Sequence, residues 1–278
     1  MTDAPRASAS TSTPLRVGVA GASGRMGQAL IAATLAAPDL ALAAALDVPG
    51  SAFLGSDAGA RIGRASGVTV DADIDAALAR IDVLIDFTRP EGTLRHAAAC
   101  AARGTRLVAG TTGLDDAGKA AIAECARNVA MVLAPNMSVG VNVLAALVEL
   151  AAARLGPAYD IEVLEMHHRH KVDAPSGTAL ALGEAAARGA GVALATHAVY
   201  AREGVTGERR GGTIGFATLR GGDVVGEHTV LFAGSGERIE LTHRATSRAN
   251  FAEGALRAAR FVRSRPAGLY DMRDVLGL

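Results

Sequence analysis

The chain has 278 residues, half of them hydrophobic, and its 28 basic residues balance its 28 acidic ones. This length allows about two domains. The balanced charge gives no support to a nucleic-acid partner, because binding to a phosphate backbone needs a basic surface. We also expect no membrane partner, since we find no apolar run of the about 18 residues that a membrane helix needs.

Two cysteines, Cys100 and Cys125, lie in alanine-rich stretches of helical character. They show neither a metal-ligand spacing nor a disulfide framework, so we interpret them as core thiols in the reducing cytoplasm. Residues 1–14 are rich in Ser, Thr and Ala and lack the apolar segment of a signal peptide. We therefore expect a disordered tail there.

From Leu15 to residue 138, short apolar segments alternate with segments of helical character. Buried strands that alternate with helices predict a parallel sheet covered on both faces, as in a Rossmann-like α/β domain. The expected strands are Leu15–Ala20, Leu40–Asp47, Val68–Val70, Ile81–Phe87, Arg106–Ala109 and Val129–Ala134, and the expected helices are Gln28–Ala37, Ile74–Arg80, Glu91–Arg103 and Asp116–Arg127.

The pattern changes in residues 139–248, which we expect to form a second, α+β domain. Its β-type runs are longer and are separated by glycine turns, which is typical of antiparallel hairpins. A last helix follows, and the pattern does not decide which domain it packs on. The expected helices are Val139–Leu155, Ser176–Arg188 and Phe251–Arg263, and the expected strands are Ile161–Met166, Thr213–Leu219, Asp223–Phe232 and Arg238–Thr242.

A glycine motif, Gly21-Ala-Ser-Gly-Arg-Met-Gly27, lies between the first strand and the first helix. Glycines at such a corner let a cofactor pyrophosphate approach the helix N-terminus, where free N–H groups favour negative charge. Asp47 ends the next strand, at about the position where an acid binds the ribose of NAD. Val48 follows it and supplies no cation for the 2′-phosphate of NADP. The alternative is an ordinary turn with a strand-end cap.

Polar loops also follow three later strands: Asp86–Thr88, Gly110–Gly113 and Ala134–Met137. The carboxyl ends of parallel strands are where such sheets bind ligands. Thr and Asn at strand ends are also common helix caps, so each loop alone leaves both interpretations open.

The densest group of reactive side chains is Glu165-Met-His-His-Arg-His-Lys171, followed by Ser176-Gly-Thr178. Histidine suits proton transfer at neutral pH, and a helix that begins at Ser176 could hold a carboxylate with its free N–H groups. If the strand extends, His168 and His170 share one face and His167 points to the other. The alternatives are a metal site, for which we find no third ligand at a characteristic spacing, and a solvated polar loop.

These residues resemble the signature of the dihydrodipicolinate (4-hydroxy-tetrahydrodipicolinate) reductase family, and the likeness extends over nearly the whole chain from Leu15. Several motifs occur in the family's order, which is far more specific than one pattern. They are Val19–Gly27, Asp86–Glu91, Gly110–Gly113, Ser138–Asn142, His167–Thr178, Gly212–Phe216 and Asp271–Leu276.

The resemblance implies a Rossmann-like nucleotide domain over 15–138, completed by 249–278, and a substrate-binding and tetramerisation domain with a mixed sheet over 139–248. It implies NADH or NADPH as the cofactor and the reduction of 4-hydroxy-tetrahydrodipicolinate in diaminopimelate and lysine biosynthesis. Because no third ligand stands at a characteristic spacing, we expect no metal. The resemblance assigns proton transfer to His167 and Lys171, substrate binding to His168, Gly177 and Thr178, and cofactor binding to Gly21, Ala22, Ser23, Gly24, Arg25, Met26, Asp47, Gly110, Thr111, Thr112, Ala134, Pro135, Asn136 and Met137.

Some members of the family carry an arginine directly after the ribose acid, where this chain has Val48. The expected cofactor preference is therefore NADH at least as much as NADPH. Two other functions stay open: another NAD(P)-dependent dehydrogenase of a small dicarboxylate or amino acid, and a non-catalytic NAD(H) sensor. An acylating semialdehyde enzyme would need an activated cysteine, and neither cysteine lies near a suitable base in the sequence.

Overall fold

The computed structural model describes residues 13–278. Most of the expected N-terminal tail, residues 1–12, lies outside the described part. The chain divides into two compact units: the first runs to Pro135 and includes Ala255–Tyr270, and the second comprises Asn136–Gly254 and Asp271–Leu278.

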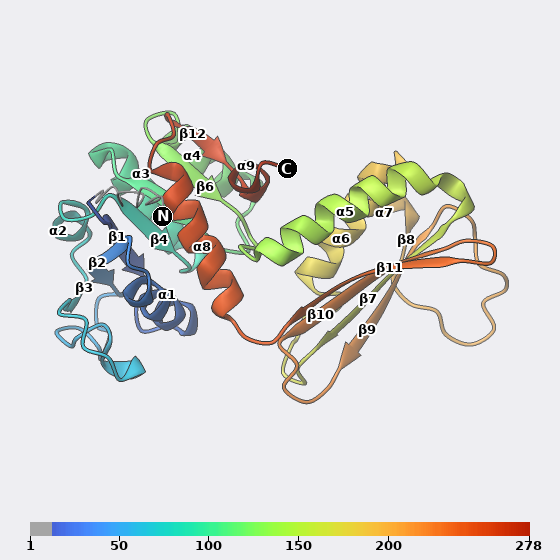
Figure 1. Ribbon diagram of the computed structural model, residues 1–278, viewed down its shortest axis with the longest axis horizontal. Helices are drawn as coiled ribbons and strands as arrows, with labels where there is room; N and C mark the ends of the chain where they lie inside the picture. The colour runs from blue at the N-terminus through green and yellow to red at the C-terminus, as the bar shows by residue number, and fades with distance from the viewer. Residues whose placement is uncertain (1–12) are drawn as a thin grey trace, which may run out of the picture. The chain divides into compact units, whose positions relative to one another are not determined.

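The first unit contains a sheet of seven strands, all parallel, in the order β12-β6-β5-β4-β1-β2-β3 (Figure 1). In its central strands β4 and β5 all residues but the half-buried Arg106 are buried, and most are apolar, as expected for a sheet covered on both faces. The predicted parallel α/β fold is confirmed. Its strands are β1 (Leu15–Ala20), β2 (Leu40–Leu46), β3 (Val70–Asp71), β4 (Val83–Asp86), β5 (Arg106–Ala109), β6 (Ala130–Leu133) and β12 (Gly268–Tyr270).

The helices of this unit begin and end within a few residues of the sequence prediction. The first helix starts three residues earlier than expected, because the glycine corner is tight enough for Arg25 to enter it. The helices are α1 (Arg25–Ala36), α2 (Ile74–Leu78), α3 (Pro90–Arg103), α4 (Asp116–Cys125) and a 3₁₀ turn at Ala60–Ile62, while α8 (Ala249–Val262) begins in the second unit and ends in the first.

The second unit has a mixed five-stranded sheet in the order β11-β10-β7-β9-β8. The predicted mixed sheet is confirmed, but the predicted hairpin between β9 and β10 is wrong. The strand β7 lies between them, parallel to β9 and antiparallel to β10, because its alternate residues are among the most deeply buried and take the centre of the sheet. The strands are β7 (Asp160–His167), β8 (Ala198–Val199), β9 (Ile214–Arg220), β10 (Gly226–Ala233) and β11 (Arg238–Ala245).

Two long helices, α5 (Val139–Leu155) and α6 (Gly177–Ala190), pack on each other and on one face of this sheet (Figure 1). Val148, Leu182 and Phe232 are fully buried between helices and sheet. Two short helices, α7 (Leu194–His197) and α9 (Met272–Leu276), were not predicted.

The segment Val139–Ala158 corrects the expectation that no stretch is long and apolar enough to cross a membrane. It has 20 residues and a mean hydropathy of 1.6, and 22% of its most apolar window is buried. Length and composition alone make this weak evidence, because a core helix passes the same test. Here α5 contributes Leu144, Val148 and Ala152 to the core of the second unit.

Candidate active site

The glycine corner between β1 and α1 can accept a phosphate group. Gly21 has a φ of +74°, and a Cβ on Gly27 would lie 2.1 Å from the Gly21 carbonyl oxygen, so both positions require glycine. Gly24 caps α1 without any side-chain hydrogen bond, and the first turn holds no acidic residue. The first N–H groups of α1 are thus left for an anion, which fits the pyrophosphate of a dinucleotide.

Asp47 lies directly after β2 and faces this corner. Its carboxylate accepts hydrogen bonds from the backbone N–H groups of Ser23, at 3.1 Å, and Val48, at 2.8 Å. The free lone pairs of the carboxylate suit ribose hydroxyl groups. A cavity of about 150 Å³ adjoins it, lined by Gly21, Leu46, Asp47, Val48, Pro49, Ala72, Ile74, Thr88, Gly92, Arg95 and His96.

The loops after β4 and β5 are held together by buried polar contacts. Asp86 is fully buried and bonds the His96 ring at 2.7 Å. The Thr111 hydroxyl lies 2.6 Å from that of Thr93. A Cβ on Gly110 would lie 2.3 Å from the Phe87 ring, so only glycine fits there. Among the predicted cofactor residues, Thr111 is therefore buried in structural contacts, whereas its neighbour Thr112 is exposed.

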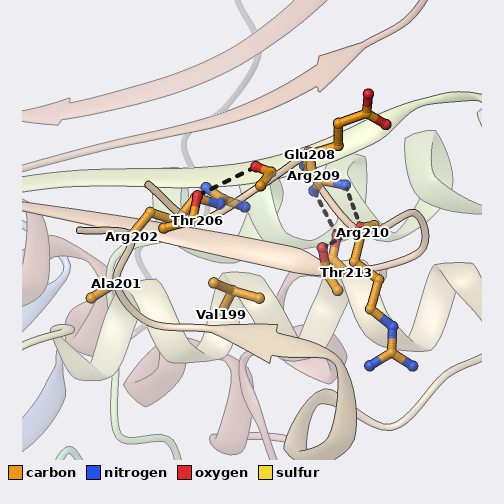
Figure 2. A pocket seen from close by; sticks show the side chains of 9 residues that line it. Val199, Ala201, Arg202, Thr206, Glu208, Arg209, Arg210 and Thr213 are labelled. Atoms are coloured by element: carbon orange, nitrogen blue, oxygen red, sulfur yellow. Dashed lines mark hydrogen bonds between the residues drawn. The ribbon is translucent and has the colours of Figure 1, made fainter. Parts of the chain in front are cut away.

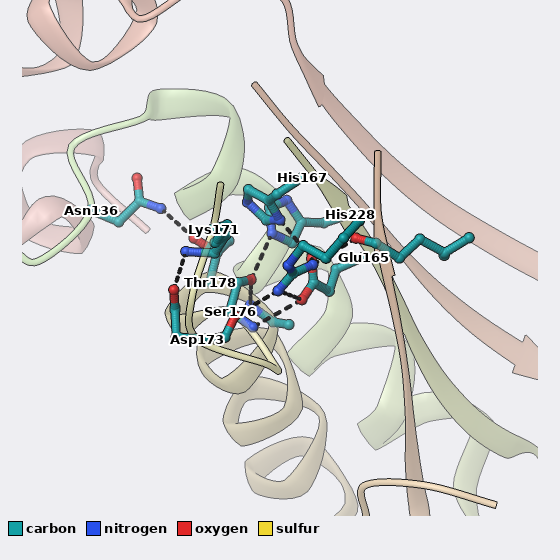
Figure 3. Close-up of polar contacts among 11 residues, drawn as sticks. Asn136, Glu165, His167, Lys171, Asp173, Ser176, Thr178 and His228 are labelled. Carbon is teal, nitrogen blue, oxygen red and sulfur yellow. Dashed lines mark hydrogen bonds and ion pairs between the residues drawn. The ribbon is translucent and has the colours of Figure 1, made fainter. Parts of the chain in front are cut away.

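In the second unit, β7 ends at His167, so the expected extension that would place His168 and His170 on one face does not occur. The His167 side chain points inward beside Glu165, and its Nδ1 lies 2.5 Å from a carboxylate oxygen of Glu165 (Figure 3). Because a carboxylate only accepts, Nδ1–H is the donor and Nε2 is left for a ligand.

Glu165 is buried and fully engaged. Arg220 donates to both of its oxygens at 2.9 Å, and the Ser176 N–H donates to one at 3.0 Å. Burial would raise the pKa of Glu165, but the Arg220, His167 and Ser176 hydrogen bonds outweigh it and hold that pKa below its ordinary value. The pKa of His167 is also lowered, by burial first and then by the nearby Lys171 and Arg220 charges, against the opposing effect of Glu165.

A second buried histidine, His228 on β10, packs edge-on against His167, with ring centroids 5.0 Å apart. The Ser176 hydroxyl accepts from the Ala179 N–H at 3.1 Å and so donates to His228 Nε2, at 3.2 Å. Burial, followed by the charge of His167, lowers the pKa of His228 to about 4. The ring is therefore neutral at physiological pH, and its buried Nδ1–H has no partner among the described residues.

The predicted proton donor Lys171 lies in the loop after β7 and is paired with Asp173, with 2.7 Å between Nζ and the carboxylate (Figure 3). This contact is the first cause of the lowered pKa of Asp173. The His168 N–H bonds the Val224 carbonyl at 2.7 Å, while its Nδ1 is buried without a partner among residues 13–278. Both residues lie in the loop that directly follows β7, the strand that carries Glu165 and His167.

The start of α6 completes the cluster. Ser176 caps the helix, Gly177 is exposed with open space around it, and the Thr178 hydroxyl accepts from Asn136 Nδ2 at 3.0 Å. Asn136, predicted as a cofactor residue, is thereby placed beside a predicted substrate residue. Of its neighbours, Ala134 and Met137 are buried and Pro135 is exposed.

Sequence reasoning missed Arg220 and His228. Both lie on strands that flank β7, and Arg220 is the register partner of His167. Strand register decides which distant side chains become neighbours, and the sequence holds no local signal for it. The sequence did carry a signal for Glu165. Side chains alternate between the two faces of a strand, so residues 165 and 167 of β7 share a face.

Two further features belong to the same unit. A cavity of about 470 Å³ in the loop before β9 is lined by Arg202, Arg209 and Arg210 with six other residues (Figure 2). Glu162 pairs with both Arg202 and Arg209, and Asp160 also pairs with Arg209, so part of the positive charge of this cavity is already offset. Among residues 13–278, no group of three His, Cys, Asp or Glu side chains could hold a metal ion.

Comparison with known proteins bears directly on these two units. The family model "Dihydrodipicolinate reductase, N-terminus" matches residues 15–137, and "Dihydrodipicolinate reductase, C-terminus" matches residues 140–276. The chain belongs to the dihydrodipicolinate reductase family. The family resemblance predicted from the motifs is confirmed, and with it the prediction of an oxidoreductase that uses a nicotinamide cofactor.

Named relatives align with nearly the whole length of this chain. The 4-hydroxy-tetrahydrodipicolinate reductase of Thiobacillus denitrificans is 62% identical over 264 residues, which are 95% of this chain and 99% of the relative. That of Cupriavidus necator is 59% identical, with 95% and 100% covered. A solved, dipicolinate-bound dihydrodipicolinate reductase from Paenisporosarcina sp. TG-14 is 25% identical and has a TM-score of 0.76, over 94% of this chain and 99% of that one.

Proposed function

We propose that the chain catalyses the reduction of 4-hydroxy-tetrahydrodipicolinate to tetrahydrodipicolinate, with loss of water, in diaminopimelate and lysine biosynthesis. The observation that carries this proposal is the buried His167–Glu165 pair beside the start of α6, in a family whose named relatives are reductases of this substrate. The same cluster speaks against a sensor without turnover, which needs no proton donor.

The second unit would bind the dicarboxylate. Gly177 and Thr178 open α6, where N–H groups favour a carboxylate, and Gly177 leaves open space in front of them. His168 and Lys171 are polar groups of the adjoining loop, and Lys171 would exchange Asp173 for a substrate carboxylate. Holding both carboxylates orients the ring of the substrate, which is a main source of rate enhancement.

The first unit would bind the cofactor, which supplies hydride when bound. Gly21, Ala22, Ser23, Gly24, Arg25 and Met26 would hold the pyrophosphate at the uncapped start of α1, and Asp47 would hold the adenosine ribose. Gly110, Thr111, Thr112, Ala134, Pro135, Asn136 and Met137 would contact the nicotinamide half, as family members with these motifs are expected to do.

His167 or Lys171 donates the proton that the reaction needs. Hydride adds to the electron-poor carbon of the unsaturated ring, and one proton must follow to balance its charge. Glu165 holds His167 in the tautomer whose Nε2 faces away from the carboxylate, so that Nε2 can exchange a proton with the substrate. Lys171, in the loop that follows β7, is the second donor.

The test is oxidation of NADH or NADPH by the purified protein, supplied with the product of pyruvate and aspartate semialdehyde condensation. His167→Gln is expected to lower kcat by about 10²–10⁴-fold, the range for one acid–base group, while the Kd of NADH stays unchanged. Cofactor oxidation that depends on another dicarboxylate or an amino acid would instead support a different dehydrogenase. Wild-type kcat in His167→Gln would contradict the assigned role.

We further propose that the chain acts in the cytoplasm as a homotetramer. Cys100 and Cys125 are both free thiols, as expected in a reducing compartment. The sheet of the second unit carries helices on one face only, which leaves its other face for subunit contacts.

A further inference from the structure

Selectivity between NADH and NADPH depends on what lies beside the ribose 2′ position. Asp47 is an anion and repels a 2′-phosphate, and the next residue, Val48, is exposed and carries no charge. A chain that used NADPH would therefore need a cation from another segment. Such a cation lies in the 3₁₀ turn at Ala60–Ile62, where Arg61 stands 14 positions after Asp47.

The Arg61 guanidinium reaches the glycine corner. It donates a hydrogen bond to the carbonyl oxygen of Ser23, and the N–H of the same Ser23 donates to the Asp47 carboxylate at 3.1 Å. Arg61 and Asp47 therefore bind the two ends of one residue, Ser23. A residue spans at most about 3.6 Å, so the two side chains come close together. A phosphate on a ribose held by Asp47 would lie within reach of the guanidinium.

The position of Arg61 is supported, and its charge is not neutralised. The guanidinium carbon lies 4.7 Å from the centroid of the Phe53 ring, a cation–π contact that holds the side chain against the loop. Among residues 13–278 no carboxylate pairs with Arg61, whereas Arg202, Arg209 and Arg220 of the second unit each pair with a carboxylate. Its N–H groups beyond the Ser23 contact are free for an anion.

We infer that Arg61 binds the 2′-phosphate of NADPH and so replaces the cation that Val48 does not provide. This inference rests on the proposed cofactor site. It makes the chain a user of both cofactors: Asp47 holds the ribose hydroxyls of NADH, and Arg61 offsets the repulsion between Asp47 and the phosphate of NADPH. Arginine is suited to this task because its planar N–H groups match phosphate oxygens.

The test is direct binding, measured as the Kd of NADPH and NADH by fluorescence titration of wild type and Arg61→Ala. Loss of a charge-assisted hydrogen bond to phosphate is expected to weaken NADPH binding about tenfold or more, with NADH changed less than about threefold. In Arg61→Ala the Kd of adenosine 2′,5′-bisphosphate should rise as that of NADPH does, and the Kd of adenosine 5′-monophosphate should change as little as that of NADH. Added salt should reduce the difference in NADPH affinity between wild type and Arg61→Ala, because the pair of Arg61 and the phosphate is exposed.

Three variants serve as comparisons. Arg64→Ala removes an exposed arginine of the same loop that makes no side-chain contact at the corner, and both Kd values should stay at wild type. Arg95, which lines the adjoining cavity, is a rival cation, and so is the exposed Arg25 of the glycine corner. Selective loss of NADPH binding in Arg95→Ala or Arg25→Ala but not in Arg61→Ala would overturn the inference, and so would equal weakening of both cofactors in Arg61→Ala. Failure of wild type to bind either cofactor would instead refute the proposed function.

Discussion

A single buried carboxylate determines the state of the proposed acid–base residue. Glu165 is buried and accepts hydrogen bonds from His167, Arg220 and the Ser176 N–H. Through these bonds it fixes the His167 tautomer and brings the end of β9 and the start of α6 to the same point. Glu165 is thus a positioning residue, and its effect should be measurable on His167 itself.

Glu165→Gln is expected to lower the pKa of His167 below its wild-type value. Burial already lowers this pKa, and the Glu165 hydrogen bond and charge oppose that effect, so neutralising Glu165 removes the opposing contribution. The pKa is measured by NMR titration of the His167 ring. If the imidazolium is the proton donor, activity is lost as pH rises through this pKa, and that loss should move to lower pH in the variant.

Glu162→Gln provides the matched control. Glu162 also lies on β7 and pairs with arginines, but it is on the opposite face of the strand. Its substitution should leave the His167 titration unchanged. An unchanged or raised His167 pKa in Glu165→Gln would contradict the positioning role.

At this scale the sequence revealed the reactive residues but not all their partners. His167, Lys171 and Ser176 stand together in the chain, and histidine chemistry pointed to proton transfer. Arg220 and His228 come from strands more than 50 positions away, and only the β7–β9 and β7–β10 registers bring them to Glu165 and Ser176. Such registers depend on the whole sheet.

Among the elements, the corner of β1 and α1 was predicted well because its constraints are local. The glycine spacing indicates a tight turn, and the turn allows α1 to begin as soon as Arg25. The order of β9 and β10 was not predictable in the same way. Glycines between them suggested a hairpin, yet the central place went to β7, whose burial could not be read from the turn residues.

Gly27→Ala tests whether this corner serves as a phosphate site. Its Cβ would lie 2.1 Å from the Gly21 carbonyl oxygen and 2.9 Å from the Ala22 Cα, both backbone atoms, so the loop must shift. We expect the Kd of NADH and of NADPH to rise equally, by about tenfold or more, since both carry the same pyrophosphate. Isothermal titration calorimetry measures both values.

The control for this change is Gly211→Ala, at a glycine of the second unit with open space around it and no positive φ. It should bind both cofactors as wild type does. Cofactor affinities that survive Gly27→Ala, with a circular dichroism spectrum that shows a folded chain, would place the pyrophosphate elsewhere.

For the whole molecule, the decisive feature is the face of the second sheet that carries no helix. Along β7, Ile161, Val163 and Glu165 face the helices and are buried. On the other face Leu164 is 37% exposed, and Leu219 on β9 is 44% exposed beside Met166. Thr229 on β10 is the register partner of Leu164 and extends this face across the sheet. Apolar side chains in neighbouring strands form a patch of the kind that subunit interfaces cover.

Burial of this face between copies is therefore the physical basis that we propose for the tetramer. Sedimentation equilibrium should give four times the chain mass of 28.1 kDa for the wild type. Leu164→Lys is expected to shift the mass to smaller species, because an interface core does not tolerate an unpaired charge. Leu278→Lys, at a leucine that is 48% exposed and outside the sheet, should keep the wild-type mass. A wild type of one chain mass, or a Leu164→Lys variant that stays tetrameric, would show that this face does not hold the subunits together.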